Sequence, residues 1–349
     1  MEQRWTMVLT AIAVILISCS SIQANSAAFE TDPFHQPDFR IGVGVGTDGP
    51  FIFVGIDRAY QYSNFSLEPL GTVIGKTFEL GQDFFQESME VYEYQEDGWT
   101  DEAVYTSDFP PYRFMGTRNN RVILMVHGLF TGEHLEWTEA ADLIRSRDSN
   151  VEIYAVDYGT GYHLEHLGRI LAQIIADCVK EGTEVSIIAH SQGGLISRTA
   201  LELYNTGRTN VRRLITLATP HLGVYYGTAA VKAADGLIKM IPEISDLMSE
   251  SEFLETLNSS IKYLDVEYYF AAGIERQVFA PFWDIANQFA SIDLSQIVND
   301  GVVERSSALG SGLRFQQYRP VFETTEFAVD HTSIMSDEAV LQQVWDWLY

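Results

Sequence analysis

The sequence predicts an α/β fold: a mostly parallel, doubly wound sheet with helices on both faces. Two observations lead to this prediction. Between residues 121 and 217, short apolar runs alternate with helical segments, and the runs begin about thirty residues apart, which is typical of βαβ units. In addition, the apolar run 185–189 leads into His190-Ser191-Gln192-Gly193-Gly194, a pattern typical of a strand that stops at a sharp turn before a helix.

Residues 1–28 are expected to lie outside the fold as a signal peptide. The apolar run 8–17 is too short to span a bilayer as a stable helix. The tetrapeptide that ends at Cys19 resembles a bacterial lipobox, and the serine after it resembles the outer-membrane type. This predicts lipidation of Cys19 and a lipoprotein of the cell envelope, in the outer membrane. Ordinary cleavage after Ala24 or Ala28, giving a secreted protein, is the alternative.

The composition of residues 29–115 predicts an N-terminal β-rich extension that packs against the main domain. Residues 40–46 and 50–56 have β-type composition, and Asp48-Gly49 between them is a turn signal. The alternating glycines of the first run lack the spacing and the following helix of a phosphate-binding loop, so they indicate strand and turn. Residues 76–95 predict further β-like or partly helical segments.

Residues 116–349 are the predicted main domain. Its first strand, 122–126, is continuously apolar, as expected of a strand buried on both faces. The helix predicted at 163–180 has apolar residues at helical spacing, and Cys178 among them is expected to be an inert core residue. The predicted strands are 122–126, 151–156, 185–189, 211–217 and 266–272, and the predicted helices are 136–146, 163–180, 195–204 and 338–348.

Residues 221–262 interrupt the alternation of strands and helices. They predict helices around 228–241 and 244–257, which we expect to form a cap over the strand ends near Ser191. A peripheral helical pair that only packs on the sheet is the alternative. Beyond this insertion, the apolar residues Phe279, Phe282 and Trp283 indicate an acyl chain as the bound group.

Composition excludes several classes of function. The formal net charge of −26 argues against nucleic-acid binding, because phosphates would be repelled. The chain has two cysteines, and no disulfide framework is possible once Cys19 is lipidated or removed. No cluster of acids has the spacing of a calcium site, so we expect no metal and no cofactor.

A serine nucleophile needs a histidine base held by a carboxylate. In doubly wound hydrolases these follow the order serine, acid, histidine along the chain. After Ser191, Asp300 lies in a turn sequence and His331 precedes the C-terminal helix, so both suit these roles. Glu275, directly after the strand 266–272, is the alternative acid. Asp330 is expected at the surface or behind the site, since adjacent side chains rarely share the needed geometry.

Five motifs in order give a more specific indication. They are His127-Gly128-Leu129, Ala189-His190-Ser191-Gln192-Gly193-Gly194, Ala218-Thr219-Pro220-His221-Leu222-Gly223, Asn299-Asp300-Gly301-Val302-Val303 and Asp330-His331. Together they resemble a bacterial triacylglycerol lipase of the α/β-hydrolase superfamily, over roughly residues 120–349. The chain departs from the family pattern at Ala189, where glycine is commoner, and at Glu304, where many relatives have proline.

The resemblance implies a role for each matched residue. Ser191 would be the nucleophile, Asp300 the acid and His331 the base, and the backbone N–H groups of Leu129 and Gln192 would form the oxyanion hole. We expect three other histidines to have supporting roles. His127 and His190 would brace the loops of the site, and His221 would stabilise the turn before the cap.

The sequence therefore predicts a serine hydrolase that cleaves carboxylic esters of lipid-like substrates through an acyl-enzyme. A phospholipase or an acyltransferase on glycerolipids would use the same residues. A protein that is not an enzyme, serving as a scaffold in the cell envelope, is the alternative from another class of function. The natural ester, the acyl-chain preference and the oligomeric state are left open by the sequence.

Overall fold

The computed structural model describes residues 39–46, 49–56, 89–106, 115–129, 134–159, 161–204, 210–224, 242–260, 262, 264–276 and 297–349. The signal peptide with Cys19, the helix expected at 228–241 and the apolar residues Phe279, Phe282 and Trp283 lie outside these ranges.

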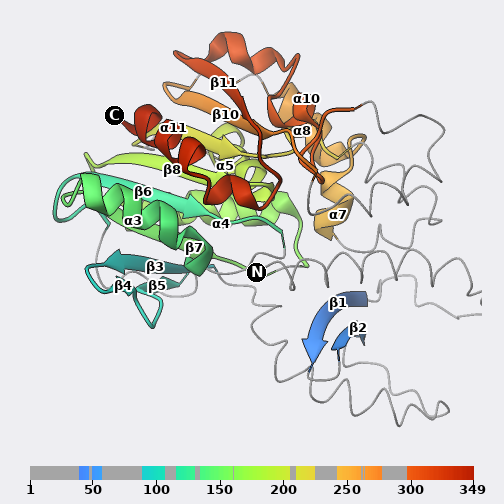
Figure 1. Ribbon diagram of the computed structural model, residues 1–349, viewed down its shortest axis with the longest axis horizontal. Coiled ribbons are helices and arrows are strands. Elements are labelled where there is room, and N and C mark those ends of the chain that lie inside the picture. Colours follow the sequence, from blue (N-terminus) through green and yellow to red (C-terminus); the bar gives the residue numbers. More distant parts are fainter. Residues whose placement is uncertain are drawn as a thin grey trace, which may run out of the picture.

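One large mixed sheet organises the main domain (Figure 1). Its strand order is β11-β10-β9-β8-β6-β7-β3-β4, and β5 pairs with β3. The six strands from β11 to β7 run parallel, whereas β3 runs antiparallel to β7. The bounds are β3 Glu90–Gln95, β4 Gly98–Trp99, β5 Tyr105–Thr106, β6 Arg121–Val126, β7 Glu152–Asp157, β8 Glu184–His190, β9 Val211–Leu217, β10 Glu267–Gly273 and β11 Phe322–Phe327.

Helices cover both faces of this sheet, each over its own apolar core. Leu171 of α4 and Leu195 of α5 belong to one core, whereas Ile144 of α3 and Val344 of α11 belong to the other. The predicted α/β class with a mostly parallel sheet is confirmed. The bounds are η2 His134–Trp137, α3 Thr138–Arg147, α4 Leu164–Cys178, α5 Gln192–Glu202, α7 Pro242–Leu247, α8 Glu252–Ser259, α10 Arg305–Ala308, η5 Arg314–Tyr318, η6 Ser333–Met335 and α11 Glu338–Leu348.

The predicted strands of the main domain agree with the observed ones to within one residue at each end. Strand β11 was not predicted, because its sequence is mostly polar and contains no apolar run. The helix expected at 244–257 is instead two helices, α7 and α8. Ser251 separates them, and its Oγ accepts a hydrogen bond of 3.2 Å from the N–H of Leu254, which caps α8.

Two parts of the expected N-terminal extension are described. Strands β1 (Phe39–Gly46) and β2 (Gly49–Ile56) pair antiparallel, with Gly46 opposite Gly49. Residues 89–106 contribute β3, β4 and β5 to the main sheet. The sheet therefore draws one end from sequence that precedes the βαβ units.

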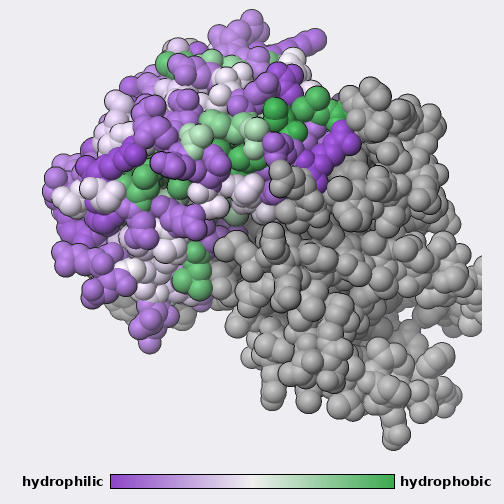
Figure 2. Space-filling view, viewed as in Figure 1, coloured by the Kyte–Doolittle hydropathy of each residue, from purple (hydrophilic) through white to green (hydrophobic). Residues whose placement is uncertain are grey.

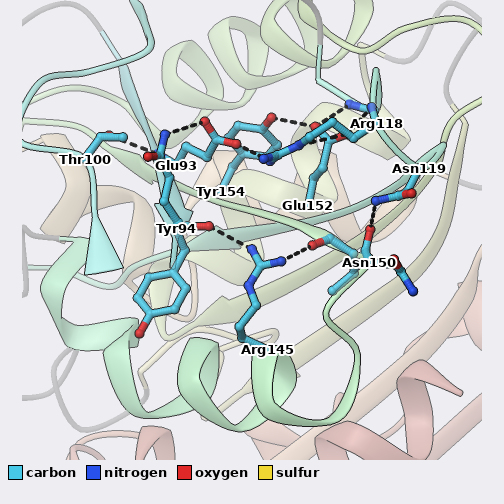
Figure 3. Close-up of polar contacts among 12 residues, drawn as sticks. Glu93, Tyr94, Thr100, Arg118, Asn119, Arg145, Asn150, Glu152 and Tyr154 are labelled. Carbon is cyan, nitrogen blue, oxygen red and sulfur yellow. Dashed lines mark hydrogen bonds and ion pairs between the residues drawn. The ribbon is translucent and has the colours of Figure 1, made fainter. Parts of the chain in front are cut away.

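Buried polar groups join β3 to its neighbour β7 (Figure 3). Arg118 forms an ion pair with the buried carboxylate of Glu93. The Glu152 carboxylate accepts hydrogen bonds from the Tyr154 hydroxyl at 2.7 Å and from the N–H of Arg118 at 2.6 Å. Burial opposes ionisation of Glu152, but these hydrogen bonds outweigh it and hold its pKa below the usual value.

The face of the described part drawn in Figure 2 is mostly hydrophilic, with small separate hydrophobic areas, as suits a strongly acidic chain. Cys178 is buried on α4, and burial raises the pKa of its thiol to about 12, as expected of an inert core residue. Within the described residues, no helix is both long and apolar enough to cross a bilayer.

Candidate active site

Ser191 occupies the sharp turn between β8 and α5. Its backbone has φ 52° and ψ −128°, a conformation that non-glycine residues rarely adopt. The turn is fixed by its main chain: Ser191 N–H donates to the carbonyl of Leu217 at 2.9 Å, and Gly194 N–H donates to the carbonyl of Ser191 at 3.1 Å. The serine predicted from sequence therefore sits at the strand-to-helix turn.

The glycines around Ser191 are required by close packing. A Cβ on Gly193 would lie 2.3 Å from the carbonyl oxygen of His127, and one on Gly194 would lie 2.1 Å from Oγ1 of Thr219. A Cβ on Gly128 would lie 2.9 Å from Cβ of Ser191. The loop that follows β6 is thus pressed directly against the turn that carries the serine.

Ser191, His331 and Asp300 form a continuous line of hydrogen bonds. His331 Nε2 lies 3.0 Å from Ser191 Oγ, and His331 Nδ1 lies 2.8 Å from Asp300 Oδ2. All three side chains are buried, and the N–H of His331 also donates to the carbonyl of Asp300 at 3.0 Å. In the tautomer that suits this line, Nδ1–H donates to the carboxylate and Nε2 accepts from the serine hydroxyl.

The carboxylate of Asp300 is held on both oxygens. Its Oδ1 accepts hydrogen bonds from the N–H groups of Val302 at 2.9 Å and Val303 at 2.7 Å, which leaves Oδ2 for His331. Although Asp300 is distant from β10 in sequence, a Cβ on Gly273, the last residue of β10, would lie 2.8 Å from Cβ of Asp300. The acid therefore lies at a strand end.

The other acids weighed from sequence do not occupy this position. Glu275 donates its main-chain N–H to the carbonyl of Val329 at 3.0 Å, while the carboxylate at His331 Nδ1 is that of Asp300. Asp330 turns its side chain back on its own loop, where Oδ1 accepts from the N–H groups of Thr332 and Ser333, each at 2.9 Å. Asp330 thus shapes the turn after His331.

Two further histidines pack around the hydrogen-bonded line. His190 Nε2 donates to the carbonyl of His331 at 2.8 Å, and burial lowers its pKa well below the usual value. His127 stacks on the Tyr158 ring with centroids 4.0 Å apart, and the Tyr158 hydroxyl donates to the carbonyl of His127 at 2.6 Å. Sequence reasoning missed Tyr158. The only available signal was its position two residues after the end of the predicted strand 151–156.

His221 lies in the turn after β9, next to a buried ion pair that sequence reasoning also missed. Its Nδ1 accepts from Arg198 at 3.5 Å and its Nε2 donates to Oγ1 of Thr216 at 3.0 Å. Arg198 also pairs with Glu202 at 2.9 Å. Burial and the Arg198 charge lower the pKa of His221 well below its usual value, which keeps the ring neutral.

Gln192 and Leu129, expected to supply the oxyanion hole, both lie beside Ser191. Gln192 is the first residue of α5, and the first N–H groups of a helix have no acceptor within it. Leu129 follows Gly128, whose close approach to Ser191 is described above. The two backbone N–H groups therefore come from the two segments that meet at the serine.

In the part of the chain that the structure describes, no group of three or more His, Cys, Asp and Glu side chains is arranged to hold a metal ion. At Ser191, the structure brings together a hydroxyl, an imidazole and a carboxylate.

The chain is similar to several known proteins. Residues 122–287 match the model of the palmitoyl protein thioesterase family. A segment is 30% identical over 115 residues to GPI inositol-deacylase B of Yarrowia lipolytica, covering 27% of this chain and 12% of that protein. Another is 26% identical over 147 residues to putative GPI inositol-deacylase C of the same organism, covering 38% and 17%. The chain therefore spans less than a fifth of the length of these curated relatives.

Among solved structures, the lipase BlEst2 of Bacillus licheniformis is similar in both of its forms. The propeptide form matches with a TM-score of 0.51 and 21% identity, covering 65% of this chain and 49% of that chain. The mature form matches with a TM-score of 0.50 and 21% identity, covering 65% and 90%. The chain thus has the α/β-hydrolase fold, and it resembles hydrolases of the lipase and esterase type.

Proposed function

We propose that this protein is a serine hydrolase that cleaves carboxylic esters of lipid-like substrates. The observation that carries the proposal is the buried line from Ser191 Oγ through His331 to Asp300, with distances of 3.0 and 2.8 Å. Such a line activates a hydroxyl that is otherwise a weak nucleophile.

In the proposed reaction, Ser191 Oγ attacks the ester carbonyl carbon while His331 Nε2 takes the hydroxyl proton. The oxygen that becomes negative accepts hydrogen bonds from the N–H groups of Leu129 and Gln192, and Asp300 stabilises the imidazolium. His331 returns the proton to the leaving alcohol, which leaves an acyl group on Ser191. Water, deprotonated by His331, then releases the carboxylic acid and restores the hydroxyl.

Lipid-like substrates are supported by the names of the similar proteins, which are a lipase, a palmitoyl protein thioesterase family and GPI inositol-deacylases. Triacylglycerol is the substrate that the sequence motifs favour, and the apolar character of Phe279, Phe282 and Trp283 favours an acyl chain as the bound group. A fatty-acyl thioester is a second candidate, because the family model matches the segment that contains Ser191. Phospholipid hydrolysis and acyl transfer would follow the same steps with a different leaving group or acceptor.

We also propose that lipidation of Cys19 holds the enzyme at the outer membrane, where it would meet lipid substrates. Two or more acyl chains anchor a protein stably, whereas one gives only marginal binding. Mass spectrometry of the protein from membranes tests this: a lipidated N-terminal Cys19 supports it, and a mature N-terminus beyond residue 19 contradicts it.

The proposal is tested with a panel of p-nitrophenyl esters, a triacylglycerol, a phospholipid and palmitoyl-CoA, together with a fluorophosphonate label. We expect wild type to hydrolyse at least one substrate and to take up the label, and Ser191→Ala to do neither. Ser146→Ala, at an exposed serine of α3, is the matched control. Labelling of Ser191→Ala at the wild-type rate would overturn the assignment.

A further inference from the structure

Two histidines bracket the short segment that carries Leu129. His127 follows the end of β6, and His134 begins η2, with residues 130–133 between Leu129 and His134 in the sequence. A displacement of about 1 Å in a positioning group can cost about a hundredfold in rate. The groups that fix His127, two residues before Leu129, therefore bear on where the N–H of Leu129 points.

His127 is fixed by backbone and ring contacts at the end of β7. Its Nδ1 donates to the carbonyl of Gly128 at 2.8 Å, and its Nε2 accepts from the N–H of Tyr158 at 3.3 Å. Burial lowers the pKa of His127, so the ring stays neutral and Nε2 remains an acceptor. This end of the segment is held by Tyr158, the residue directly after β7.

His134 is fixed by the neighbouring residue and by the added strand β3. Its Nδ1 lies 2.7 Å from Oδ2 of Asp157, the last residue of β7, and both side chains are largely buried. Its ring stacks on Tyr92 of β3 with centroids 3.9 Å apart and meets Trp99 of β4 edge-on at 5.6 Å. A hydrogen bond shielded from water in this way is stronger than one at the surface.

Asp157 and Tyr158 are consecutive, so the strand end that binds His134 also binds His127. Strand β7 lies between β6, which leads into His127, and β3, which supplies the stacking ring of Tyr92. Cross-strand pairing of Glu90 with Asp157 fixes the register of β3 at this end. The N-terminal strand β3 is thus linked to His127 through His134, Asp157 and Tyr158.

We infer that His134 is a positioning residue for the oxyanion hole, acting through its bond to Asp157 and its stack on Tyr92. Strand β3 thereby contributes to turnover without touching the substrate. The inference rests on the proposed function, because it concerns the stabilisation of the oxyanion formed when Ser191 attacks.

The test uses the full chain and two measurements: the kinetics of p-nitrophenyl butyrate hydrolysis, and the affinity for a trifluoromethyl ketone whose serine adduct carries an oxyanion. His134→Phe keeps a ring against Tyr92 but loses the bond to Asp157. We expect kcat to fall by about tenfold or more, short of the 10²–10³ typical of losing a donor outright, with KM within about twofold. Affinity for the ketone should fall by the same factor as kcat.

Two other variants test the route through β3. Tyr92→Leu removes the stacked ring and should reproduce part of the loss of kcat and of ketone affinity. Tyr92→Phe keeps the ring and should behave as wild type. His166→Phe makes the same change as His134→Phe at a half-buried histidine of α4, and it should also behave as wild type.

Wild-type kcat and ketone affinity in folded His134→Phe would overturn the inference, and so would a loss confined to KM. If His134→Phe shows no cooperative thermal unfolding, Asp157→Asn decides by the same measurements, since it keeps the shape but weakens the bond. Ser191→Ala separates the two claims: if it retains turnover, the proposed function fails, whatever His134 does.

Discussion

Ser191 has a backbone conformation that costs about 1–3 kcal/mol of conformational free energy, and the surrounding residues hold it in that conformation. The segment after β6 crowds it from one side, and the carbonyl of Leu217 binds its N–H from another. A hydroxyl placed this way projects from the strand end rather than capping the helix, and the structure shows no side-chain cap hydrogen bond from it. This residue-scale strain favours a nucleophile over a helix cap.

Asp300→Asn is predicted to lower kcat by about 10³–10⁴ without unfolding the protein. The amide would still accept the N–H bonds of the turn, but its NH₂ group would face His331 Nδ1 and favour the wrong imidazole tautomer. Steady-state kinetics and thermal unfolding measure the two effects. Asp330→Asn and Glu275→Gln are the matched controls, and a larger loss in Glu275→Gln than in Asp300→Asn would reassign the acid.

Gly193→Ala is predicted to abolish turnover and to destabilise the fold by about 1–3 kcal/mol. The new methyl group would meet the carbonyl oxygens of His127 and Val126 at 2.3 and 2.5 Å, and backbone atoms cannot rotate away. Urea denaturation and ester hydrolysis check this. Wild-type stability and rate would show that the two segments are less closely packed than described.

The sequence could predict the residues that the structure joins in the hydrogen-bonded line, but not those that hold them in place. Ser191, Asp300 and His331 stand in recognisable motifs with a fixed chain order. His134, Asp157 and Tyr158 have no such motif, because their contacts depend on which strands are neighbours. The pairing of β3 with β7 is a long-range choice that no local pattern in residues 89–106 reveals.

At the scale of single elements, buried strands were predicted well and the edge of the sheet was not. Strand β11 pairs only with β10, so all its side chains are partly or fully exposed and no apolar run marks it. The break between α7 and α8 was missed for another reason. Ser251 was read as part of one helix, but its side chain caps the second one.

Helix α7 is held to the start of α4 by two buried carboxylates. Asp246 accepts from the N–H of Leu164, the first residue of α4, at 2.7 Å, and Glu243 accepts from the N–H of Gly161. Burial raises the pKa of Glu243 to about 7, and the nearby charge of Asp246 adds to the effect. The raised pKa means that the folded protein prefers Glu243 protonated.

Glu243→Gln is therefore predicted to stabilise the protein above neutral pH. For wild type, the protonated form contributes stability that is fully present below the usual glutamate pKa and is lost as pH rises toward about 7. At pH 8 the glutamine variant should exceed wild type by up to about 3 kcal/mol, and near pH 5 the difference should shrink. Urea denaturation from pH 5 to pH 8 measures it. Glu255→Gln, on the exposed side of α8, should show no such pH dependence.

At the scale of the whole molecule, the sheet is completed by residues outside its βαβ units. Met89 and Val91 are fully buried against the same core as α4 and α5, and the Glu93 carboxylate is buried beside Arg118. Removing this strand would expose apolar surface along β7 and leave β7 with a bare edge. The strand is part of the folding unit.

Deletion of residues 1–106 is predicted to abolish cooperative folding. Each buried apolar side chain contributes about 1.5–3 kcal/mol to the free energy of unfolding. Losing several of them removes a free energy comparable to the total stability of a typical domain. Fluorescence-detected urea unfolding checks the result, with deletion of residues 1–28 as the control that should unfold as wild type does. A sharp transition at the wild-type midpoint for the longer deletion would contradict the prediction.

The contact between Gly273 and Asp300 brings the two ends of a long stretch of chain together. Because closing a loop becomes only slowly more costly as the loop lengthens, insertions or deletions inside this stretch need not displace the acid. Natural variation and laboratory grafting can thus change the length of this stretch while Asp300 stays beside the end of β10.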